Sequence, residues 1–239
     1  MEYLGSLLLV PDKPDPERDS ICAAWSRQGG AVERLAKFWK PRDYSGERVV
    51  LYGPQTFGLV LAQILNMQLV SPPDDLLLEL EEKWLGRRVQ SARLSAAGQW
   101  GYPIFIKPLK EKQFRAAVYS GPSDLQAETI GVAADQEVIL SDVLDIAAEV
   151  RSFVLDGVIL DAAVYEGEAD VAAARRFLER AIPDLPLPRT SVADLAKLKT
   201  GEWVILEANP AWGAGLNGCS AELVVPAIAA ASAQLERFL

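Results

Sequence analysis

The hydrophobic pattern of this 239-residue chain changes near residue 100, and this change restricts the folds that it can adopt. Up to about residue 90, short apolar runs alternate with segments of helical spacing, such as Phe57–Leu65. This alternation predicts a small parallel sheet covered by helices. Its strands are expected at residues 3–10, 48–52 and 67–70, with helical spacing also at residues 21–39, interrupted by Gly29-Gly30.

Beyond residue 100, predicted strands follow one another closely. Asp156-Gly157 between two apolar runs, residues 149–155 and 158–164, predicts a hairpin, because this pair fits a tight two-residue turn. Helices are expected only at residues 169–180 and 221–239. The chain is therefore predicted to be α+β, with an α/β segment at the front.

The chain contains no histidine, which restricts its possible chemistry. Ser-His-Asp and Cys-His catalysis, imidazole zinc sites and histidine general bases are all excluded. Carboxylates, lysines, arginines and a hard metal ion remain. These groups suit phosphoryl chemistry, in which positioning and electrostatics do most of the catalysis.

The net charge and the apolar runs exclude two classes of partner. With 24 Lys and Arg against 33 Asp and Glu, the net charge is −9, which argues against a nucleic-acid-coating role. The longest apolar runs are too short to span a bilayer, and the first residues do not resemble a signal peptide. Cys22 and Cys219 are expected to be buried thiols. We therefore expect a cytoplasmic protein without nucleic-acid or membrane partners.

Three local patterns are candidates for a site. Lys107 ends an apolar strand and is followed by a proline, so its ammonium could bind phosphate; a solvated strand-end lysine is the alternative. The strand 137–140 runs into a polar linker whose backbone could meet an adenine edge. Just beyond it, Glu149 and Arg151 share one strand face, either facing a ligand or forming a structural ion pair.

The third pattern is Trp203-Val-Ile-Leu-Glu207-Ala-Asn209, preceded by Asp194. In an extended strand Glu207 and Asn209 point the same way, and such oxygen ligands suit Mg²⁺. The alternative is an edge strand with solvated polar groups. The glycine-rich stretch 213–218 is expected to be a turn that shapes a substrate pocket. Too few residues follow it for a dinucleotide-binding unit, and Cys219 stands where a P-loop needs lysine.

In this order the patterns resemble the ATP-grasp superfamily, and more narrowly its arginine-and-two-lysines clade. The residues that carry the resemblance are Lys107, Lys112, the linker 140–145, Glu149, Arg151, Asp194, Glu207 and Asn209, with the phrase Glu-Ala-Asn-Pro-Ala-Trp-Gly-Ala-Gly-Leu-Asn-Gly and the earlier Arg87-Arg88. The resemblance implies an ATP-grasp fold of two lobes that clasp ATP, preceded by a small α/β domain. The expected domains are residues 1–95, 96–145 and 146–239.

The resemblance also implies roles for individual residues. Lys107 would contact the α- and β-phosphates, and the backbone at Asp142, Val143 and Leu144, together with Glu149, would bind the nucleoside. Asp194, Glu207 and Asn209 would hold Mg²⁺, while Lys112 and Arg151 would be catalytic, binding the γ-phosphate or the acyl phosphate. Residues 110–123 are the candidate lid.

The function so implied is an ATP- and Mg²⁺-dependent carboxylate–amine ligase that forms an amide or peptide bond through an acyl phosphate. Its partners would be a small-molecule or peptide carboxylate and an amine. Two alternatives use the same nucleotide site: a phosphotransferase to a hydroxyl acceptor, and a nucleotide-binding module without turnover.

Overall fold

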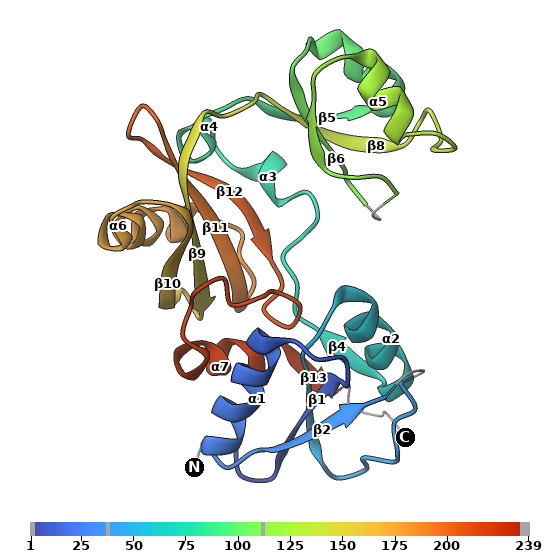
Figure 1. Ribbon diagram of the computed structural model, residues 1–239, viewed down its shortest axis with the longest axis vertical. Helices are drawn as coiled ribbons and strands as arrows, with labels where there is room; N and C mark the ends of the chain where they lie inside the picture. The colour runs from blue at the N-terminus through green and yellow to red at the C-terminus, as the bar shows by residue number, and fades with distance from the viewer. Residues whose placement is uncertain (1–2, 37–38, 111–112, 235–239) are drawn as a thin grey trace. The chain divides into compact units, whose positions relative to one another are not determined.

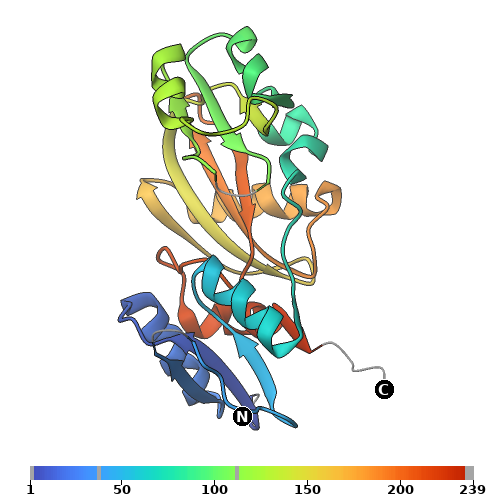
Figure 2. The ribbon, with the colours of Figure 1, turned by 90° about the vertical axis from the view of Figure 1, so that its right-hand side faces the viewer.

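The computed structural model describes residues 3–36, 39–110 and 113–234 (Figures 1 and 2). The chain forms two compact units, each with its own buried core. Unit 1 comprises residues 1–72, 148–195 and 207–239, and unit 2 comprises residues 73–147 and 196–206. The front α/β segment does not stand as a unit by itself in this grouping, and the division into residues 1–95, 96–145 and 146–239 stays a prediction.

The front of unit 1 contains the predicted parallel sheet. Strand β1 (Ser6–Pro11) lies between β2 (Ala31–Leu35) and β3 (Arg48–Leu51) and pairs in parallel with both. Helix α1 (Pro16–Arg27) begins after Asp15, whose side chain accepts the N–H of Arg18, and helix α2 (Gln55–Leu65) follows β3. The predictions of a parallel sheet and of a helix at residues 57–65 are confirmed.

Helical spacing was expected on both sides of Gly29-Gly30, but a helix forms only before them. The residues that follow form β2 and complete the parallel sheet. Gly29 has a φ of 92°, and a Cβ on Gly30 would lie 2.0 Å from the indole of Trp25. The chain therefore reverses tightly against a buried tryptophan, which a continued helix could not do.

The end of the chain also differs from the prediction. Helix α7 (Ala221–Ala229) stops early, and β13 (Ser232–Gln234) pairs antiparallel with β4 (Met67–Leu69). Thus β4 lies outside the parallel sheet, and the single helix over residues 221–239 was wrong for its second part; residues 235–239 lie outside the described residues. Helix propensity favoured the longer helix, and the pairing with β4 overrides it.

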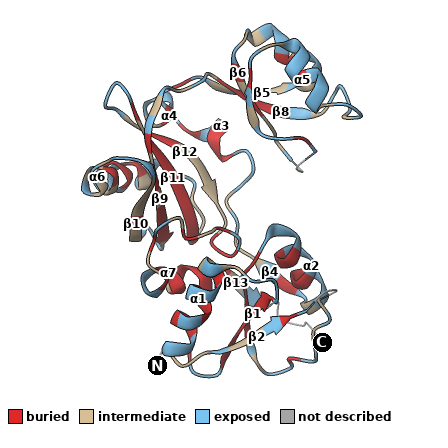
Figure 3. Cartoon of the chain, viewed as in Figure 1, coloured by how far each residue is buried: buried red, intermediate tan, exposed pale blue. Residues whose placement is uncertain are grey.

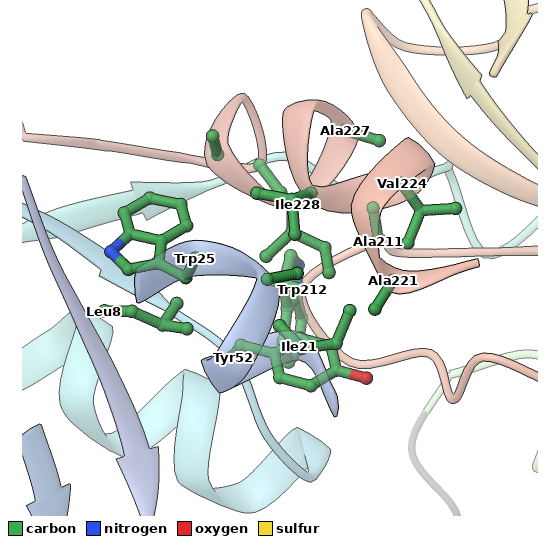
Figure 4. Packing of buried hydrophobic residues seen from close by; sticks show 14 of the residues in the cluster. Leu8, Ile21, Trp25, Tyr52, Ala211, Trp212, Ala221, Val224, Ala227 and Ile228 are labelled. Atoms are coloured by element: carbon green, nitrogen blue, oxygen red, sulfur yellow. The ribbon is translucent and has the colours of Figure 1, made fainter. Parts of the chain in front are cut away.

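The main core of unit 1 joins the front segment to the last third of the chain. Figure 4 shows Ile21 of α1 close to Trp212 and to Ile228 of α7 in the centre of the view, and Trp25 of α1 and Val224 of α7 belong to the same buried cluster. These side chains are almost completely buried, as the red segments of Figure 3 indicate. Helix α2 also approaches this core closely, because a Cβ on Gly58 would lie 2.5 Å from the ring of Trp212.

A four-stranded sheet in the order β10-β9-β11-β12 carries the predicted site residues Glu149, Arg151, Asp194, Glu207 and Asn209. Its strands are β9 (Ile146–Leu155), β10 (Val158–Gly167), β11 (Thr190–Leu198) and β12 (Trp203–Asn209). The predicted hairpin joins β9 to β10, and both Asp156 (φ 49°) and Gly157 (φ 77°) adopt left-handed conformations. Helix α6 (Val171–Ala181), also predicted, packs on β10 and is followed by the short helix η2 (Ile182–Asp184).

Unit 2 is built on an antiparallel sheet in the order β5-β8-β6-β7. Its strands are β5 (Val89–Arg93), β6 (Ile104–Pro108), β7 (Ala117–Tyr119) and β8 (Glu137–Ser141). Its helices are α3 (Leu76–Glu79), α4 (Glu82–Leu85), η1 (Leu94–Trp100) and α5 (Pro122–Glu128). The sequence did not predict β5 or α5; β5 has only exposed and half-buried side chains and lacks an apolar run.

Candidate active site

Arg151 and Asp194 form the centre of a polar cluster in unit 1. Nε of Arg151 donates to Oδ1 of Asp194 at 2.8 Å, and Nη2 donates to Oδ2 at 2.6 Å. Only 2% of the Asp194 side chain and 11% of the Arg151 side chain are exposed. Such a charge-assisted fork fixes both groups, and removing one partner would leave the other charge buried.

Asn209 joins this pair to Glu207. Its Nδ2 donates to Oδ2 of Asp194 at 3.1 Å and to Oε1 of Glu207 at 2.7 Å. The alternation of side chains along β12 brings Glu207 and Asn209 to the same face, as expected from their spacing. Of the predicted site residues, the structure therefore brings Arg151, Asp194, Glu207 and Asn209 together.

The two carboxylates of this cluster oppose one another electrostatically. Burial raises the pKa of Asp194, and the nearby charge of Glu207 raises it further, while Arg151 lowers it. Burial by itself would lower the pKa of Arg151, but its hydrogen bonds to Asp194 raise it above the usual arginine value. Two carboxylates thus share one arginine, and the negative charge of Glu207 disfavours that of Asp194.

The cluster is compatible with a magnesium ion. Among the described residues, no group of three His, Cys, Asp or Glu side chains could hold a metal, so a site here would use two carboxylates and one amide. Mg²⁺ takes few protein carboxylates and completes its octahedron with phosphate and water. The amide nitrogen of Asn209 now faces both carboxylates, and a cation would require the amide oxygen on that side. Each Asp194 oxygen would then accept one hydrogen bond from Arg151 and keep a lone pair for the cation.

Glu149 reaches the cluster through a residue that the sequence did not suggest. The hydroxyl of Tyr165, on β10, donates to Glu149, and the guanidinium carbon of Arg151 lies 5.8 Å from the centre of the Tyr165 ring. Burial, followed by the bond to Glu149, raises the pKa of Tyr165. The alternation along β9 placed Glu149 and Arg151 on one face, but only the structure shows that Tyr165, at the irregularity of the β9–β10 pairing, contacts both.

The glycine-rich turn after β12 is held by side chains from distant parts of unit 1. Glu17 accepts the N–H groups of Leu216 at 2.9 Å and Asn217 at 2.8 Å. Tyr52 donates to the carbonyl of Ala214, and Nη1 of Arg151 donates to that of Gly215 at 3.0 Å. The turn therefore touches the polar cluster directly. Nothing in the local sequence indicated the role of Glu17, which is about 200 residues away.

The predicted nucleotide ligands of unit 2 lie on β6 and after β8. Lys107 is half-buried on β6, opposite Ile139 in the pairing with β8. Asp142 follows β8 directly, then Val143 and Leu144, which are partly exposed. The catalytic role predicted for Lys112 falls outside the described residues.

Asp142 is fully engaged in protein contacts. Its carboxylate accepts from Nε and Nη2 of Arg88, at 3.0 and 2.8 Å, and from Nε1 of Trp100 at 3.1 Å. Its own N–H donates to the carbonyl of Arg88. The hydrogen bonds from Arg88 hold the pKa of Asp142 below its usual range. Within the described residues, the backbone groups of Val143 and Leu144 make no hydrogen bond, so they are the part of the linker open to a ligand.

Arg87 is a buried cation whose hydrogen bonds, within the described part of the chain, go to a hydroxyl and to carbonyls and to no carboxylate. It donates to Oγ of Ser141 and to the carbonyls of Leu85, Ile205 and Leu206, at 2.9 to 3.2 Å. Burial lowers its pKa to about 10. It ties the end of β8 to the β12 residues that precede Glu207. The sequence pattern includes the Arg87-Arg88 dipeptide but did not predict these contacts of Arg87.

Two open hollows in unit 2 lie beside α4 rather than at the predicted residues. One, of about 290 Å³, is lined by Arg87, Arg88 and Trp100 among others, and the second, of about 450 Å³, lies beside Trp203. Neither is lined by Lys107, Val143 or Leu144. These two hollows therefore do not mark the predicted phosphate-binding lysine or the free backbone groups of the linker.

A family model for the ATP-grasp domain of the arginine-and-two-lysines clade, family 2, matches residues 84–227, more than half of the chain. The chain belongs to this family. No curated protein sequence matches it. The match includes every predicted site residue and leaves β1, α1, β3 and α2 outside.

Several solved structures share the fold of this chain at low sequence identity. D-cycloserine synthetase DcsG is 20% identical with a TM-score of 0.56, over 95% of this chain and 99% of that one. Macrocyclase MdnC from Microcystis aeruginosa MRC, bound with precursor peptide MdnA, is 12% identical with a TM-score of 0.57, over 94% and 98%. N5-carboxyaminoimidazole synthetase from Staphylococcus aureus, complexed with ADP, is 10% identical with a TM-score of 0.53, over 96% and 78%.

The comparisons confirm the α+β ATP-grasp fold and the resemblance to the arginine-and-two-lysines clade, both predicted from the sequence. Among the described residues, no helix is both long and apolar enough to cross a membrane.

Proposed function

We propose that this ATP-grasp protein is an ATP- and Mg²⁺-dependent ligase that joins a carboxylate to an amine through an acyl phosphate. The observation that carries the proposal is the hydrogen-bonded cluster of the buried Asp194 and the half-buried Arg151, Asn209 and Glu207. It gathers oxygen ligands beside an arginine that Asp194 holds. Similar structures include a synthetase and a peptide macrocyclase, and one holds ADP, which supports this reaction class.

The proposed site residues would have two roles, metal binding and nucleotide binding. Asp194, Glu207 and Asn209 would hold Mg²⁺, which, when bound, neutralises charge on the phosphates. Arg151, held by Asp194 and by the carbonyl of Gly215, would place its guanidinium against the transferred phosphoryl group. Lys107 would bind phosphate as a compact charge, and the free backbone groups of Val143 and Leu144 would bind the adenine edge.

The reaction follows from these placements. A carboxylate oxygen of the substrate attacks the γ-phosphorus, and the bond to the β–γ bridging oxygen breaks to release ADP. The amine then attacks the acyl carbon, the bond to the phosphate oxygen breaks, and the amine loses a proton. Water must be kept from the acyl phosphate, because hydrolysis would waste it. The lid expected at residues 110–123 stays a prediction, because residues 111–112 lie outside the described residues and residues 117–119 form β7. A small-molecule or peptide carboxylate is the proposed substrate.

The first test is a thermal-shift titration with ATP and Mg²⁺. Ligand at a hundredfold over its Kd stabilises by about 2.7 kcal/mol, which is roughly 5–10 °C at this chain length. We expect this shift in the wild type, a smaller one in Lys107→Ala, and the full shift in Lys40→Ala, which removes an exposed lysine. A wild-type Tm that does not respond to ATP with Mg²⁺ would contradict the proposal.

The second test separates ligation from its alternatives. A ligase releases ADP and free phosphate only when both a carboxylate and an amine from an amino-acid and peptide panel are present. A phosphotransferase would leave the phosphate on a stable product. A module without turnover would bind ATP tightly, even as Glu207→Gln, and would release no acceptor-dependent ADP.

A further inference from the structure

The pairing of β5 with β8 continues for one residue beyond its last strand pair, Val89 and Ser141. The N–H of Asp142 donates to the carbonyl of Arg88 at 3.2 Å, and the N–H of Arg88 donates back to Oδ2 of Asp142 at 3.2 Å. The Arg88 guanidinium then forms its fork with the same carboxylate. Arg88 therefore holds Asp142 through both its backbone and its side chain.

Trp100 fixes this arginine from a second direction. The guanidinium carbon of Arg88 lies 4.7 Å from the centre of the Trp100 ring, and Nε1 of Trp100 donates to Oδ1 of Asp142. Stacking restricts the plane of the guanidinium, while the indole N–H and the fork restrict the carboxylate. The three side chains thus form a closed brace around the first linker residue.

The buried side of the linker is braced as well. Nε of Arg87 donates to Oγ of Ser141, and this hydroxyl donates to the carbonyl of Asp142 at 2.8 Å. Every backbone group of Asp142 is therefore satisfied within the protein. The backbone groups of Val143 and Leu144, which follow, make no hydrogen bond within the described part of the chain. The hydrogen bonds that fix Asp142 thus stop directly before Val143, the first linker residue with free backbone groups.

We propose that Arg88 and Trp100 are positioning residues that determine nucleobase selectivity: they fix Asp142, so that the free backbone groups of Val143 and Leu144 are held in place to read adenine. The inference rests on the proposed function, because it needs a nucleotide at this linker. The sequence predicted that the backbone of Asp142, Val143 and Leu144 binds the nucleoside. In this proposal only Val143 and Leu144 contact the base, and Asp142 holds them in position.

A purely structural role would look different. The Arg88 side chain is 66% exposed, and exposed ion pairs contribute little to stability. Losing the brace should therefore change selectivity much more than the melting temperature. Arg189 offers a matched control, because it forms the same fork to Asp156 and accepts the Asp156 N–H at 2.7 Å, at the β9–β10 hairpin.

The experiment measures the affinities for ATP and GTP, each with Mg²⁺, by calorimetry on the full chain. We expect the wild type to prefer ATP and Arg88→Ala to lose about tenfold or more of the ATP:GTP affinity ratio, with a nearly unchanged Tm. Trp100→Phe keeps a ring but loses the N–H donor, and should lower the ratio by less. Arg189→Ala should leave the ratio at the wild-type value.

Two failures are distinguishable. If the wild type binds neither nucleotide, the proposed function fails and this inference with it. If the wild type binds ATP but shows no preference over GTP, or if Arg88→Ala keeps the wild-type ratio, only the positioning role is overturned.

Discussion

At the scale of single residues, the carboxylate of Glu207 is expected to lower the stability of the folded protein, because it repels a second carboxylate. The Glu207 carboxylate lies near the buried Asp194 and raises the pKa of that group. Hydrogen bonds from Asn209 moderate this repulsion without removing either charge. Residues that cost stability and gain nothing from packing are expected where a ligand completes the interaction.

We therefore predict opposite effects of Glu207→Gln on stability and on binding. The amide oxygen keeps the bond from Asn209 while the charge disappears, so the metal-free protein should melt a few degrees higher; at this length 2–4 °C corresponds to about 1 kcal/mol. The Tm shift caused by Mg²⁺ with ATP should be lost. Differential scanning calorimetry with and without ligand measures both effects.

The control for this pair of effects is Glu168→Gln, which removes one negative charge from an exposed position of unit 1. It should change neither the metal-free Tm nor the ligand-induced shift appreciably. A Glu207→Gln protein that melts lower than the wild type and still responds fully to Mg²⁺ with ATP would show that Glu207 serves packing alone.

The lowered pKa of Asp142 predicts a pH dependence of defined sign. Arg88 and Trp100 favour the charged carboxylate in the folded state, so its folded pKa lies below the unfolded value of about 3.9. Its stabilising contribution is present above that value and is lost as the pH falls through the folded pKa. The Tm difference between the wild type and Asp142→Asn should therefore be constant from pH 7 to about pH 5 and shrink below pH 4. A difference that grows on acidification would contradict this assignment.

At the scale of elements, the sequence predicted those that depend on local signals. The β9–β10 hairpin follows from Asp156-Gly157, and the shared face of Glu207 and Asn209 follows from strand alternation. The short strands β2 and β13 were not predicted, because each is defined by a distant partner. The contributions of Tyr165 and Glu17 to the site were missed for the same reason.

The glycine-rich turn provides a test of one such distant contact. A Cβ on Gly215 would lie 2.5 Å from Oε2 of Glu17, the carboxylate that accepts the Leu216 and Asn217 N–H groups. Gly215→Ala should displace Glu17 and leave these donors without their partner, at a cost of about 1–3 kcal/mol. Chemical denaturation of the full chain measures this loss.

Gly213→Ala is the matched control, because its Cβ would meet no atom closer than 3.6 Å. It should be close to neutral. In a Glu17→Ala background the clash is absent, so Gly215→Ala should then cost much less than in the wild type. Additive losses in this double-mutant cycle would mean that Gly215 is required for a reason unrelated to Glu17.

At the scale of the whole molecule, the core of unit 1 includes residues that precede the part of the chain matched by the family model. The match covers residues 84–227 and includes all predicted site residues. The core that supports the turn after β12 also requires Leu8, Ile21, Trp25 and Val50, which precede the match. Sequence patterns place the candidate site residues within the matched part, but they did not show that the scaffold of these residues depends on the front of the chain.

We therefore predict that a fragment of residues 84–227 does not fold cooperatively, although it contains the whole candidate site. Without α1 and β1, the apolar faces of Trp212 and Val224 are exposed to water, at about 25 cal/mol per Å² of apolar surface. The fragment should bind a hydrophobic dye, lack near-ultraviolet dichroism and show no Tm shift with ATP and Mg²⁺, whereas the full chain shows a sharp transition. A fragment that melts sharply and responds to the nucleotide would mean that the front segment serves the substrate and not the fold.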